Sequence, residues 1–465
     1  MSEKSNGISR RSFFKKSSAA TAAVAAGSLV TNADLDSISA NVNTNSKPSD
    51  LKITDMRLAR FGNWQQYVLR LDTNQGITGY GELHAGSSKN YALTLKSRIL
   101  GMNPCNVDQI FRKIKQFGGV SRQGAGVSSV EMACWDLAGK AWGVPVWQML
   151  GGKFRDKVLI YADTDGSLDP EVMAGRLKER MDTGFKFLKM DLPVARLLRD
   201  IEGTMTAPPG MIESSNIAHP FTGMTITDKG LKIVQEYCAT VRDIIGWEIP
   251  VATDHYGHFV IESCIKLARA LDQFNFAWLE DMVPWQLTDQ YVRLKNSCET
   301  PILTGEDIHL KEGFMDLFEK KAISICHPDT GPIGGIFETK KVGDLAQEHG
   351  IAMAIHNAGL PPMNFASVHA AAATENFMCL EHHHIEDAED WYDDLYANIE
   401  KPLVKDGYIN VPDGPGLGFE FNEEALRKVL IEEEGWFLPT PEWDNEQSHD
   451  RLWSLDPGQK RSASV

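Results

Sequence analysis

Two neighbouring stretches of the chain are short apolar runs that each end in a carboxylate: Phe276-Ala277-Trp278-Leu279-Glu280 and Pro301-Ile302-Leu303-Thr304-Gly305-Glu306. Similar runs occupy residues 158–162, 187–192, 250–254, 322–329, 352–356 and 377–381. Longer amphipathic stretches separate the runs, a pattern typical of repeated βα units. Eight strands are enough to close a parallel barrel, so the sequence predicts an α/β fold built on a TIM-like barrel.

The ends of these strands carry the residues that point to chemistry. Six consecutive strands end, at intervals of 23 to 27 residues, in an acid or an imidazole: Asp254, Glu280, Glu306, Asp329, His356 and Glu381. The carboxyl ends of the strands form one rim of a closed barrel, which we call the barrel mouth. We therefore expect all six side chains to converge there.

The first three of these residues predict a metal site. Asp254, Glu280 and Glu306 offer hard oxygen ligands of the kind that Mg²⁺ prefers, and three such ligands leave about three positions of an octahedral ion for water or substrate. Without a cation, three negative charges on one rim would repel one another. The sequence thus predicts one Mg²⁺ per subunit.

The remaining residues predict proton transfer. Asp329 and His356 end neighbouring strands, so the carboxylate can orient the imidazole as a general base, a device that contributes about 10²–10⁴ in rate. Lys189 and Asp191 are two apart on one strand and face the same side. Glu381 can donate or accept a hydrogen bond where an oxyanion develops. Together with the metal, these groups suit abstraction of a proton α to a carboxylate, with stabilisation of the enediolate.

Length, charge and cysteine content narrow the class of protein. The 465 residues suffice for a barrel plus a companion domain. With 63 acidic and 47 basic side chains the formal charge is −16, so we expect neither a nucleic-acid partner nor a membrane-surface partner. The seven cysteines are scattered without a CxxC pair, which excludes a disulfide scaffold. The expected partner is a small-molecule carboxylate.

The N-terminus has the features of an export signal. Ser9-Arg10-Arg11-Ser12-Phe13-Phe14-Lys15 is a twin-arginine motif, and a short run rich in alanine and serine follows it at residues 17–30. We therefore expect residues 1–49 to be a signal peptide and linker. Recognition by the twin-arginine export machinery would place the protein in the periplasm.

Further motifs occur in order along the predicted elements. Those before the barrel are Gly79-Tyr80-Gly81-Glu82, residues 131–140 and Leu150-Gly151-Gly152. Those within and after it are Leu188-Lys189-Met190-Asp191, Trp278-Leu279-Glu280-Asp281, Leu303-Thr304-Gly305-Glu306-Asp307, His327-Pro328-Asp329, Ala354-Ile355-His356-Asn357, Leu380-Glu381-His382 and residues 411–418. In these motifs the chain resembles the enolase superfamily, specifically its mandelate racemase / muconate lactonizing enzyme-like subgroup.

The resemblance implies a domain plan and a site. An α+β capping domain at 50–155, with strands at 52–61, 66–71 and 77–83 and a helix at 127–143, would precede a (β/α)₇β barrel at 156–400. The segment 401–465 would return to complete the capping domain and end in a polar tail. Mg²⁺ would lie on Asp254, Glu280 and Glu306 beside an Asp329–His356 dyad, and capping loops at 61–64 and 82–86 would close over the substrate. Members of the family are commonly homo-oligomers.

Two departures from the family pattern bear on the reaction. Family racemases usually carry Lys-x-Lys on the second barrel strand, whereas this chain has Lys189 followed by Asp191. The loss of the second lysine favours dehydration of a sugar acid to a 2-keto-3-deoxy acid, with His356 as base. Acid candidates are His356 once protonated, Tyr256, which replaces the usual Asn or His, and its neighbours His255 and His258. The alternatives are a racemase, epimerase or cycloisomerase that uses Lys189 with Asp191, and a non-catalytic sugar-acid-binding protein.

Two other segments depart from the repeat. Residues 193–249, between the second and third barrel strands, form a longer connection than usual. Within it, residues 206–223 are rich in Pro, Gly, Ser and Met, and we expect this stretch to cover the mouth, meet another subunit or form a solvated surface insertion. His382-His383-His384 lies at one strand end. Three adjacent imidazoles there cannot aim at one point, so a second metal is not expected.

Overall fold

A computed structural model describes residues 47–62, 66–118, 125–206, 223–257, 259–383 and 391–445. The predicted export signal lies outside the described residues up to position 46, as do His258, His384 and most of the loop 61–64. No helix within the described ranges is both long and apolar enough to cross a membrane. The described chain begins at Lys47, whose backbone N–H donates to Gln75 Oε1 at 2.7 Å.

An antiparallel sheet begins the fold, in the order β1 (Ile53–Phe61), β2 (Gln66–Thr73) and β3 (Thr78–Leu83). Its helices are α3 (Lys89–Leu93), α4 (Lys96–Ile99), α5 (Val107–Ile114) and α6 (Ala125–Trp142). Helix α6 packs so closely on β3 that a Cβ on Gly81 would lie 1.9 Å from the Ser129 carbonyl oxygen. The glycines of the Gly79-Tyr80-Gly81 motif therefore allow helix and strand to approach.

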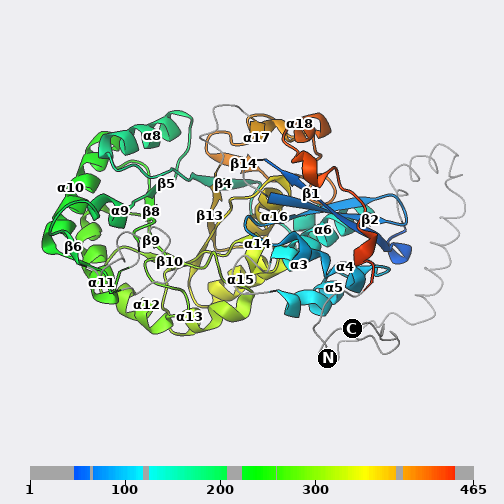
Figure 1. Cartoon of the computed structure of the whole chain (residues 1–465), viewed down its shortest axis with the longest axis horizontal. Helices are drawn as coiled ribbons and strands as arrows, with labels where there is room; N and C mark the ends of the chain where they lie inside the picture. Colours follow the sequence, from blue (N-terminus) through cyan, green and yellow to red (C-terminus); the bar gives the residue numbers. More distant parts are fainter. Residues whose placement is uncertain are drawn as a thin grey trace, which may run out of the picture. The chain divides into compact units, whose positions relative to one another are not determined.

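The second layer of the fold is a closed parallel barrel (Figure 1). Strands β13 and β4 pair and close it, in the order β4 (Lys157–Ala162), β5 (Leu188–Asp191), β8 (Val251–Asp254), β9 (Leu279–Glu280), β10 (Ile302–Thr304), β11 (Ile325–Cys326), β12 (Ala352–Ile355) and β13 (Phe377–His382). This arrangement confirms the predicted eight-stranded barrel with an N-terminal capping domain.

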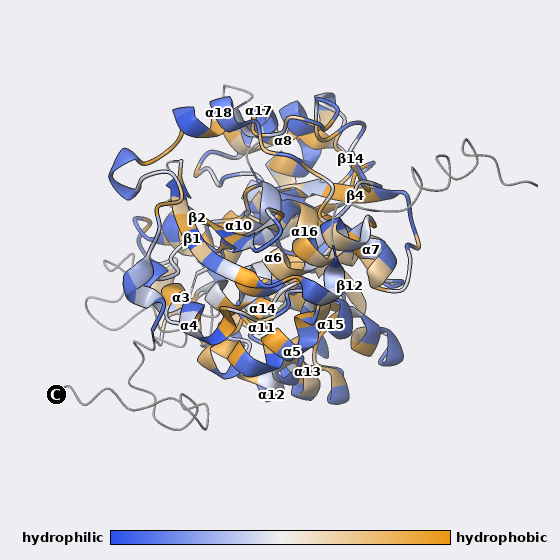
Figure 2. Ribbon diagram, turned by 90° about the vertical axis from the view of Figure 1, so that its right-hand side faces the viewer, coloured by the Kyte–Doolittle hydropathy of each residue, from blue (hydrophilic) through white to orange (hydrophobic). Residues whose placement is uncertain are grey.

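Helices follow the first seven strands and surround the barrel. They are α8 (Pro170–Asp182), α10 (Asp228–Ile245), α11 (Ile261–Leu271), α12 (Thr288–Lys295), α13 (Met315–Glu319), α15 (Ile336–Glu348) and α16 (Pro361–Ala372). The outer helices α12 and α13 carry both hydrophobic and hydrophilic residues (Figure 2). The interior of the barrel is filled by Tyr161, Phe187, Trp278, Leu303, Ile325, Ala354 and Cys379. It is a packed core, so chemistry is confined to its ends.

The strands are shorter than predicted where the site residues lie. Glu306, Asp329 and His356 come just after β10, β11 and β12 instead of ending them. Gly305 turns the chain with φ +142°, and Asp329 caps the short helix α14 (Thr330–Ile333) by accepting from the Gly331 N–H. An isolated parallel bridge still pairs Asp329 with His356. The turn at Gly305 and the cap at Asp329 therefore help to set the directions of the Glu306 and Asp329 side chains.

The connection after β5 is irregular. It contains α9 (Val194–Leu198) and a hairpin of β6 (Met205–Thr206) with β7 (Thr225–Ile226), and residues 207–222 between these strands lie outside the described part. The Ala195 N–H donates to the Tyr256 carbonyl at 2.9 Å. The connection thus packs beside the segment that follows β8.

The C-terminal segment returns to the capping domain. After α17 (Trp391–Asp394), strand β14 (Tyr408–Asn410) pairs antiparallel with β4, and α18 (Glu423–Lys428) follows. Further on, Phe61 bridges Leu430 and the Tyr67 hydroxyl donates to Glu434 Oε1 at 2.9 Å. The capping domain is thus built from both ends of the described chain, as the fold prediction required.

Candidate active site

Lys189 lies among four carboxylates of the barrel mouth. Its Nζ is 2.7 Å from Glu381 Oε1 and 3.2 Å from Glu280 Oε1. Asp254 Oδ2 and Asp163 Oδ1 lie at 3.4 and 3.6 Å. Burial alone would lower the pKa of Lys189, but the surrounding carboxylates outweigh it and hold that pKa well above its usual value. The side chain is therefore a fixed ammonium.

The three predicted metal ligands lie on this rim in two adjacent groups of potential ligand atoms. Glu280 and Glu306 share one group with His327, and Asp254 shares the other with Asp191 and His255; within each group the atoms lie within 4.8 Å of one another. Glu280 Oε2 also accepts from Trp278 Nε1 at 2.9 Å. Burial raises the pKa of Glu280 well above its usual range, against the opposing charge of Lys189.

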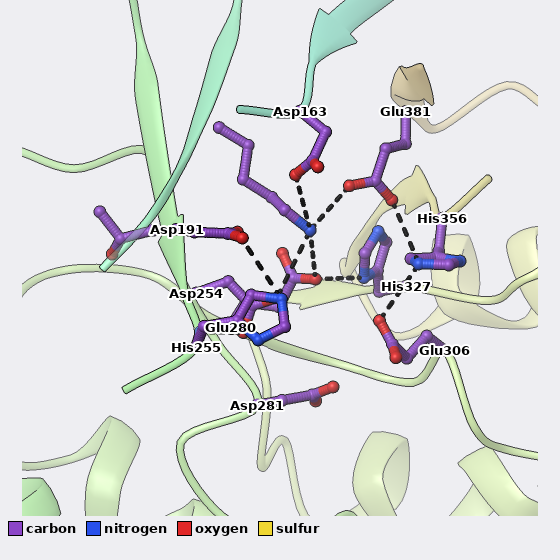
Figure 3. A network of polar contacts seen from close by, with 12 residues as sticks. Asp163, Asp191, Asp254, His255, Glu280, Asp281, Glu306, His327, His356 and Glu381 are labelled. Atoms are coloured by element: carbon purple, nitrogen blue, oxygen red, sulfur yellow. Dashed lines mark hydrogen bonds and ion pairs between the residues drawn. The ribbon is translucent and has the colours of Figure 1, made fainter. Parts of the chain in front are cut away.

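These residues fit a divalent cation. The close view shows the carboxyl groups of Asp163, Asp254, Glu280, Glu306 and Glu381 gathered at the mouth (Figure 3), and four of them lie within 4 Å of the Lys189 ammonium. Buried negative charge that is not fully compensated is costly, and a hard cation held by oxygen atoms would offset it. The donor set of Asp254, Glu280 and Glu306 is of the kind that suits Mg²⁺.

The predicted dyad is assembled. His356 Nδ1 lies 2.5 Å from Asp329 Oδ2, and His84 of the capping domain places Nε2 3.3 Å from the same oxygen. Although burial raises the pKa of Asp329, His84 and His356 hold it well below its usual value, so Asp329 is a carboxylate. The other ring nitrogen of His356 faces the mouth, 3.4 Å from Glu306 Oε2 and 3.5 Å from Glu381 Oε2.

Electrostatics restrict what His356 and Glu381 can do. Burial would lower the pKa of His356, but Glu306, Glu381 and Asp329 raise it well above the usual value. Burial would raise the pKa of Glu381, yet Lys189 and His356 hold it well below the usual value. Glu381 is therefore an ionised acceptor, which the Asn357 N–H approaches at 3.3 Å.

Four site residues were not predicted from the sequence: His84, Asp163, His327 and His383. His327 is fully buried between the Tyr161 hydroxyl, 2.9 Å from Nε2, and Glu280. Burial lowers the pKa of His327 to about 3, so its ring is neutral. Asp163 follows β4 directly and extends the series of acids after strands, a signal that the sequence contained.

The acid candidates lie in different surroundings. Tyr256 is buried, and its hydroxyl donates to the Thr253 carbonyl at 2.7 Å. His255 is exposed, with Nε2 3.6 Å from both Asp191 Oδ1 and Asp254 Oδ2. Burial, with further repulsion from Asp163, raises the pKa of Asp191 to about 7. The Tyr256 hydroxyl is therefore part of the buried structure, whereas the His255 ring faces solvent.

His382, the last residue of β13, and His383, which follows it, point apart, as expected from a strand. His382 packs its ring on Tyr392, with centroids 5.6 Å apart. His383 instead places Nδ1 3.2 Å from Asp163 Oδ2. Among the described residues these two imidazoles share no group of potential metal ligands.

The capping domain contacts the barrel beside the site. Glu82 accepts from the Leu360 N–H at 2.8 Å and from the Met363 N–H at 3.2 Å, and Gln66 Nε2 donates to the Ala358 carbonyl at 2.8 Å. Both barrel segments follow His356 in the chain. The predicted loop 82–86 thus reaches the dyad directly through His84.

Comparison with known proteins identifies protein families and relatives that share this architecture. Residues 36–151 match the mandelate racemase / muconate lactonizing enzyme N-terminal domain, and residues 172–425 match the enolase C-terminal domain-like family. A D-xylonate dehydratase of Haloferax volcanii is 31% identical over 398 residues, 83% of this chain and 91% of that protein. A D-galactonate dehydratase of Pectobacterium atrosepticum is 27% identical over 81% of this chain and 92% of that one.

Solved structures agree with the sequence matches. A mandelate racemase/muconate lactonizing enzyme-like protein from Rubrobacter xylanophilus superposes with a TM-score of 0.73 at 28% identity, covering 84% of this chain and all of that one (100%). A putative dehydratase from Salmonella enterica serovar Typhimurium gives a TM-score of 0.72 at 25% identity, over 82% and 99% of the two chains. With its capping domain, closed barrel and carboxylate-lined mouth, this chain belongs to the enolase superfamily, in the mandelate racemase / muconate lactonizing enzyme-like subgroup.

Proposed function

We propose that this chain is a Mg²⁺-dependent hydro-lyase that dehydrates a sugar acid to a 2-keto-3-deoxy acid. The observation that carries the proposal is the orientation of His356, which has Asp329 at Nδ1 and the barrel mouth at Nε2. The names of relatives, among them D-xylonate, D-gluconate and D-galactonate dehydratases, support the lyase class and a sugar acid as substrate.

The residues of the chain divide the reaction between them. His356 Nε2 takes the proton from the carbon next to the substrate carboxylate, while Asp329 fixes the ring orientation. Lys189 remains an ammonium that stabilises the negative charge developing nearby. When bound at the three predicted ligands, Mg²⁺ supplies Lewis-acid stabilisation of the enediolate oxygens.

A substrate screen in D₂O tests the proposal. The mature chain with Mg²⁺ is offered a library of aldonic and aldaric acids, and each reaction is assayed for 2-keto-3-deoxy product and by NMR for deuterium at the α carbon. We expect keto product from one or a few stereoisomers, and a loss of about 10²–10⁴ in kcat in His356→Asn. The proposal is wrong if wild-type protein makes no keto product, or if His356→Asn retains full activity.

An isomerase is the second candidate, because Asp191 and His255 offer a second acid–base pair at the mouth. His255 Nε2 lies 3.6 Å from Asp191 Oδ1. Lys189 is instead held by four carboxylates, so its ammonium is less free to exchange protons. A racemase or epimerase of this kind would incorporate solvent deuterium into recovered substrate without forming keto product. The D₂O screen therefore distinguishes the two reactions.

Export and assembly complete the proposal. The motif Ser9-Arg10-Arg11-Ser12-Phe13-Phe14-Lys15 supports twin-arginine export to the periplasm. Replacing both arginines with lysine should keep the protein in the cytoplasmic fraction, whereas periplasmic recovery of that variant would contradict the assignment. Assembly into a homo-oligomer stays a prediction, which light scattering of the purified mature chain can test.

A further inference from the structure

A second histidine–aspartate pair lies beside the first. His356 has Nδ1 2.5 Å from Asp329 Oδ2 and Nε2 3.5 Å from Glu381 Oε2. His383 has Nδ1 3.2 Å from Asp163 Oδ2 and Nε2 3.6 Å from Glu381 Oε1. Each imidazole therefore has an aspartate at Nδ1 and one oxygen of the same glutamate at Nε2. The two ring centroids are 6.1 Å apart.

The position of His383 gives it access to a substrate. It follows β13 at the barrel mouth, and 20% of its side chain is exposed, against 7% for His356. Burial lowers the pKa of His383, but Asp163 and Glu381 outweigh this effect and raise it above the usual value. Asp163 lies at Nδ1 of His383, so Nε2, on the side of Glu381, is the nitrogen that can deliver a proton to a leaving group.

Other groups at the mouth are less suited to this task. The Lys189 ammonium is surrounded by four carboxylates, and the Tyr256 hydroxyl is bonded to Thr253. Among the described residues, Asp191 and His255 remain as competitors, but they lie against each other, with His255 Nε2 3.6 Å from Asp191 Oδ1, and the His255 side chain is 64% exposed. His383 is the imidazole that shares the Glu381 carboxylate with the proposed base.

We propose that His383, oriented by Asp163, is the general acid that protonates the leaving β-hydroxyl while His356 removes the α-proton. This assignment rests on the proposed dehydratase function. The C–H electron pair becomes the enediolate, the C–O bond breaks with its pair on oxygen, and His383 Nε2–H turns that oxygen into water. His356 gains one proton and His383 loses one, so exchange with solvent restores both rings, and the enol product becomes the ketone.

The test separates proton abstraction from loss of the leaving group. The variants are His383→Asn, His383→Gln, His356→Asn and His255→Asn. The control is His349→Gln, at the end of α15 that precedes β12 and therefore at the other end of the barrel from His356. Each is offered the best sugar acid from the screen and its 3-deoxy-3-fluoro analogue in D₂O. Keto product, released fluoride, α-deuterium in recovered substrate and Tm are measured.

The expected pattern is specific to an acid. Both His383 variants should form keto product at least about 100-fold more slowly than wild type. They should release fluoride within about tenfold of the wild-type rate, because fluoride departs without full protonation, and should accumulate α-deuterium in unreacted sugar acid. His356→Asn should lose all three activities, and His349→Gln should match wild type.

Other patterns overturn the assignment. If the His383 variants dehydrate the sugar acid within threefold of wild type, or lose exchange and fluoride release along with dehydration, His383 is not the acid. If His255→Asn alone shows the leaving-group defect, the acid is His255. Absence of keto product from wild type would overturn the dehydratase function itself, which distinguishes that failure from failure of the His383 assignment.

Discussion

Glu82 of the capping domain accepts the backbone N–H of Leu360, the residue that caps barrel helix α16, at 2.8 Å. Its other oxygen accepts from the Met363 N–H at 3.2 Å. The first turn of a helix leaves N–H groups without partners inside the helix, and here a carboxyl group from the other domain satisfies two of them. This contact joins the capping domain to the segment that follows His356.

Replacing Glu82 should therefore loosen the join between the domains. We expect Glu82→Ala to lower the free energy of unfolding by about 2–4 kcal/mol, because two buried donors lose their acceptor. Urea denaturation measures the change. Glu424→Ala, on an 84%-exposed side chain of α18, is the control and should stay within about 0.5 kcal/mol of wild type. A similarly small effect for Glu82→Ala would contradict the prediction.

Glu131 makes the stability of the protein depend on pH. It accepts from the Ile336 N–H at 2.8 Å and the Phe337 N–H at 3.0 Å, and burial raises its pKa to about 8 from a usual 4.5. The folded state thus binds this proton more tightly than the unfolded state, so the contribution to stability is present below pH 4.5 and is lost as the pH rises through 8.

We expect the free energy of unfolding to fall with pH, and Glu131→Gln to make this fall shallower. Between pH 5 and 8 the wild-type free energy of unfolding should fall, with Glu131 contributing up to about 1.4 kcal/mol per pH unit. Glu131→Gln, which cannot titrate, should be less stable at pH 5 and should show a shallower slope. Urea denaturation at several pH values measures both. Parallel curves for wild type and variant would show that Glu131 does not titrate in this range.

Removing the metal should affect both stability and activity. We expect a chelator to lower Tm and to reduce dehydration at least about 100-fold, and added Mg²⁺ to restore both. A ligand at 100 times its Kd stabilises the folded state by about 2.7 kcal/mol. Glu280→Gln should lose the Mg²⁺-dependent rise in Tm, whereas Asp289→Asn, on an 82%-exposed side chain, should keep it. An equal Tm with chelator and with Mg²⁺ would refute the metal site.

Lys189 should be important for folding as well as for chemistry. Lys189→Met leaves the carboxylates around it without their buried cation, and we expect a loss of about 3–5 kcal/mol at pH 7. The loss should shrink at pH 5, where some of these carboxyl groups take up protons. Lys232→Met removes a 77%-exposed ammonium and is the control. Equal stability of the two variants in urea would show that the carboxylates do not need Lys189.

Substitution of Tyr256 tests whether its hydroxyl takes part in the reaction. Its hydroxyl is hydrogen-bonded to Thr253 in the buried core, so Tyr256→Phe should keep kcat within about threefold and lower stability by about 1 kcal/mol. Steady-state kinetics with the sugar acid from the screen measures the effect on rate. A loss of kcat greater than 100-fold would instead make Tyr256 a proton donor.

The predicted residues differ in how directly the sequence locates them. Strand periodicity and the repeat of acids after apolar runs are local features, so they predicted the barrel and the residues at its mouth, from Asp254 to Glu381. The strand ends were less accurate, because Gly305 and the Asp329 cap end β10 and β11 early through turns that periodicity does not describe. Asp163 fitted the same local pattern and was nevertheless missed.

By itself, the sequence determined the barrel, the capping sheet and the chemical type of the groups at the mouth, because alternation of apolar and polar residues is fixed by neighbours in the chain. The tertiary structure decided which of these groups meet. It placed Lys189 among four carboxylates, His84 on Asp329 and His383 on Asp163. These contacts join residues far apart in sequence, and their geometry depends on how the closed barrel and the capping domain pack together.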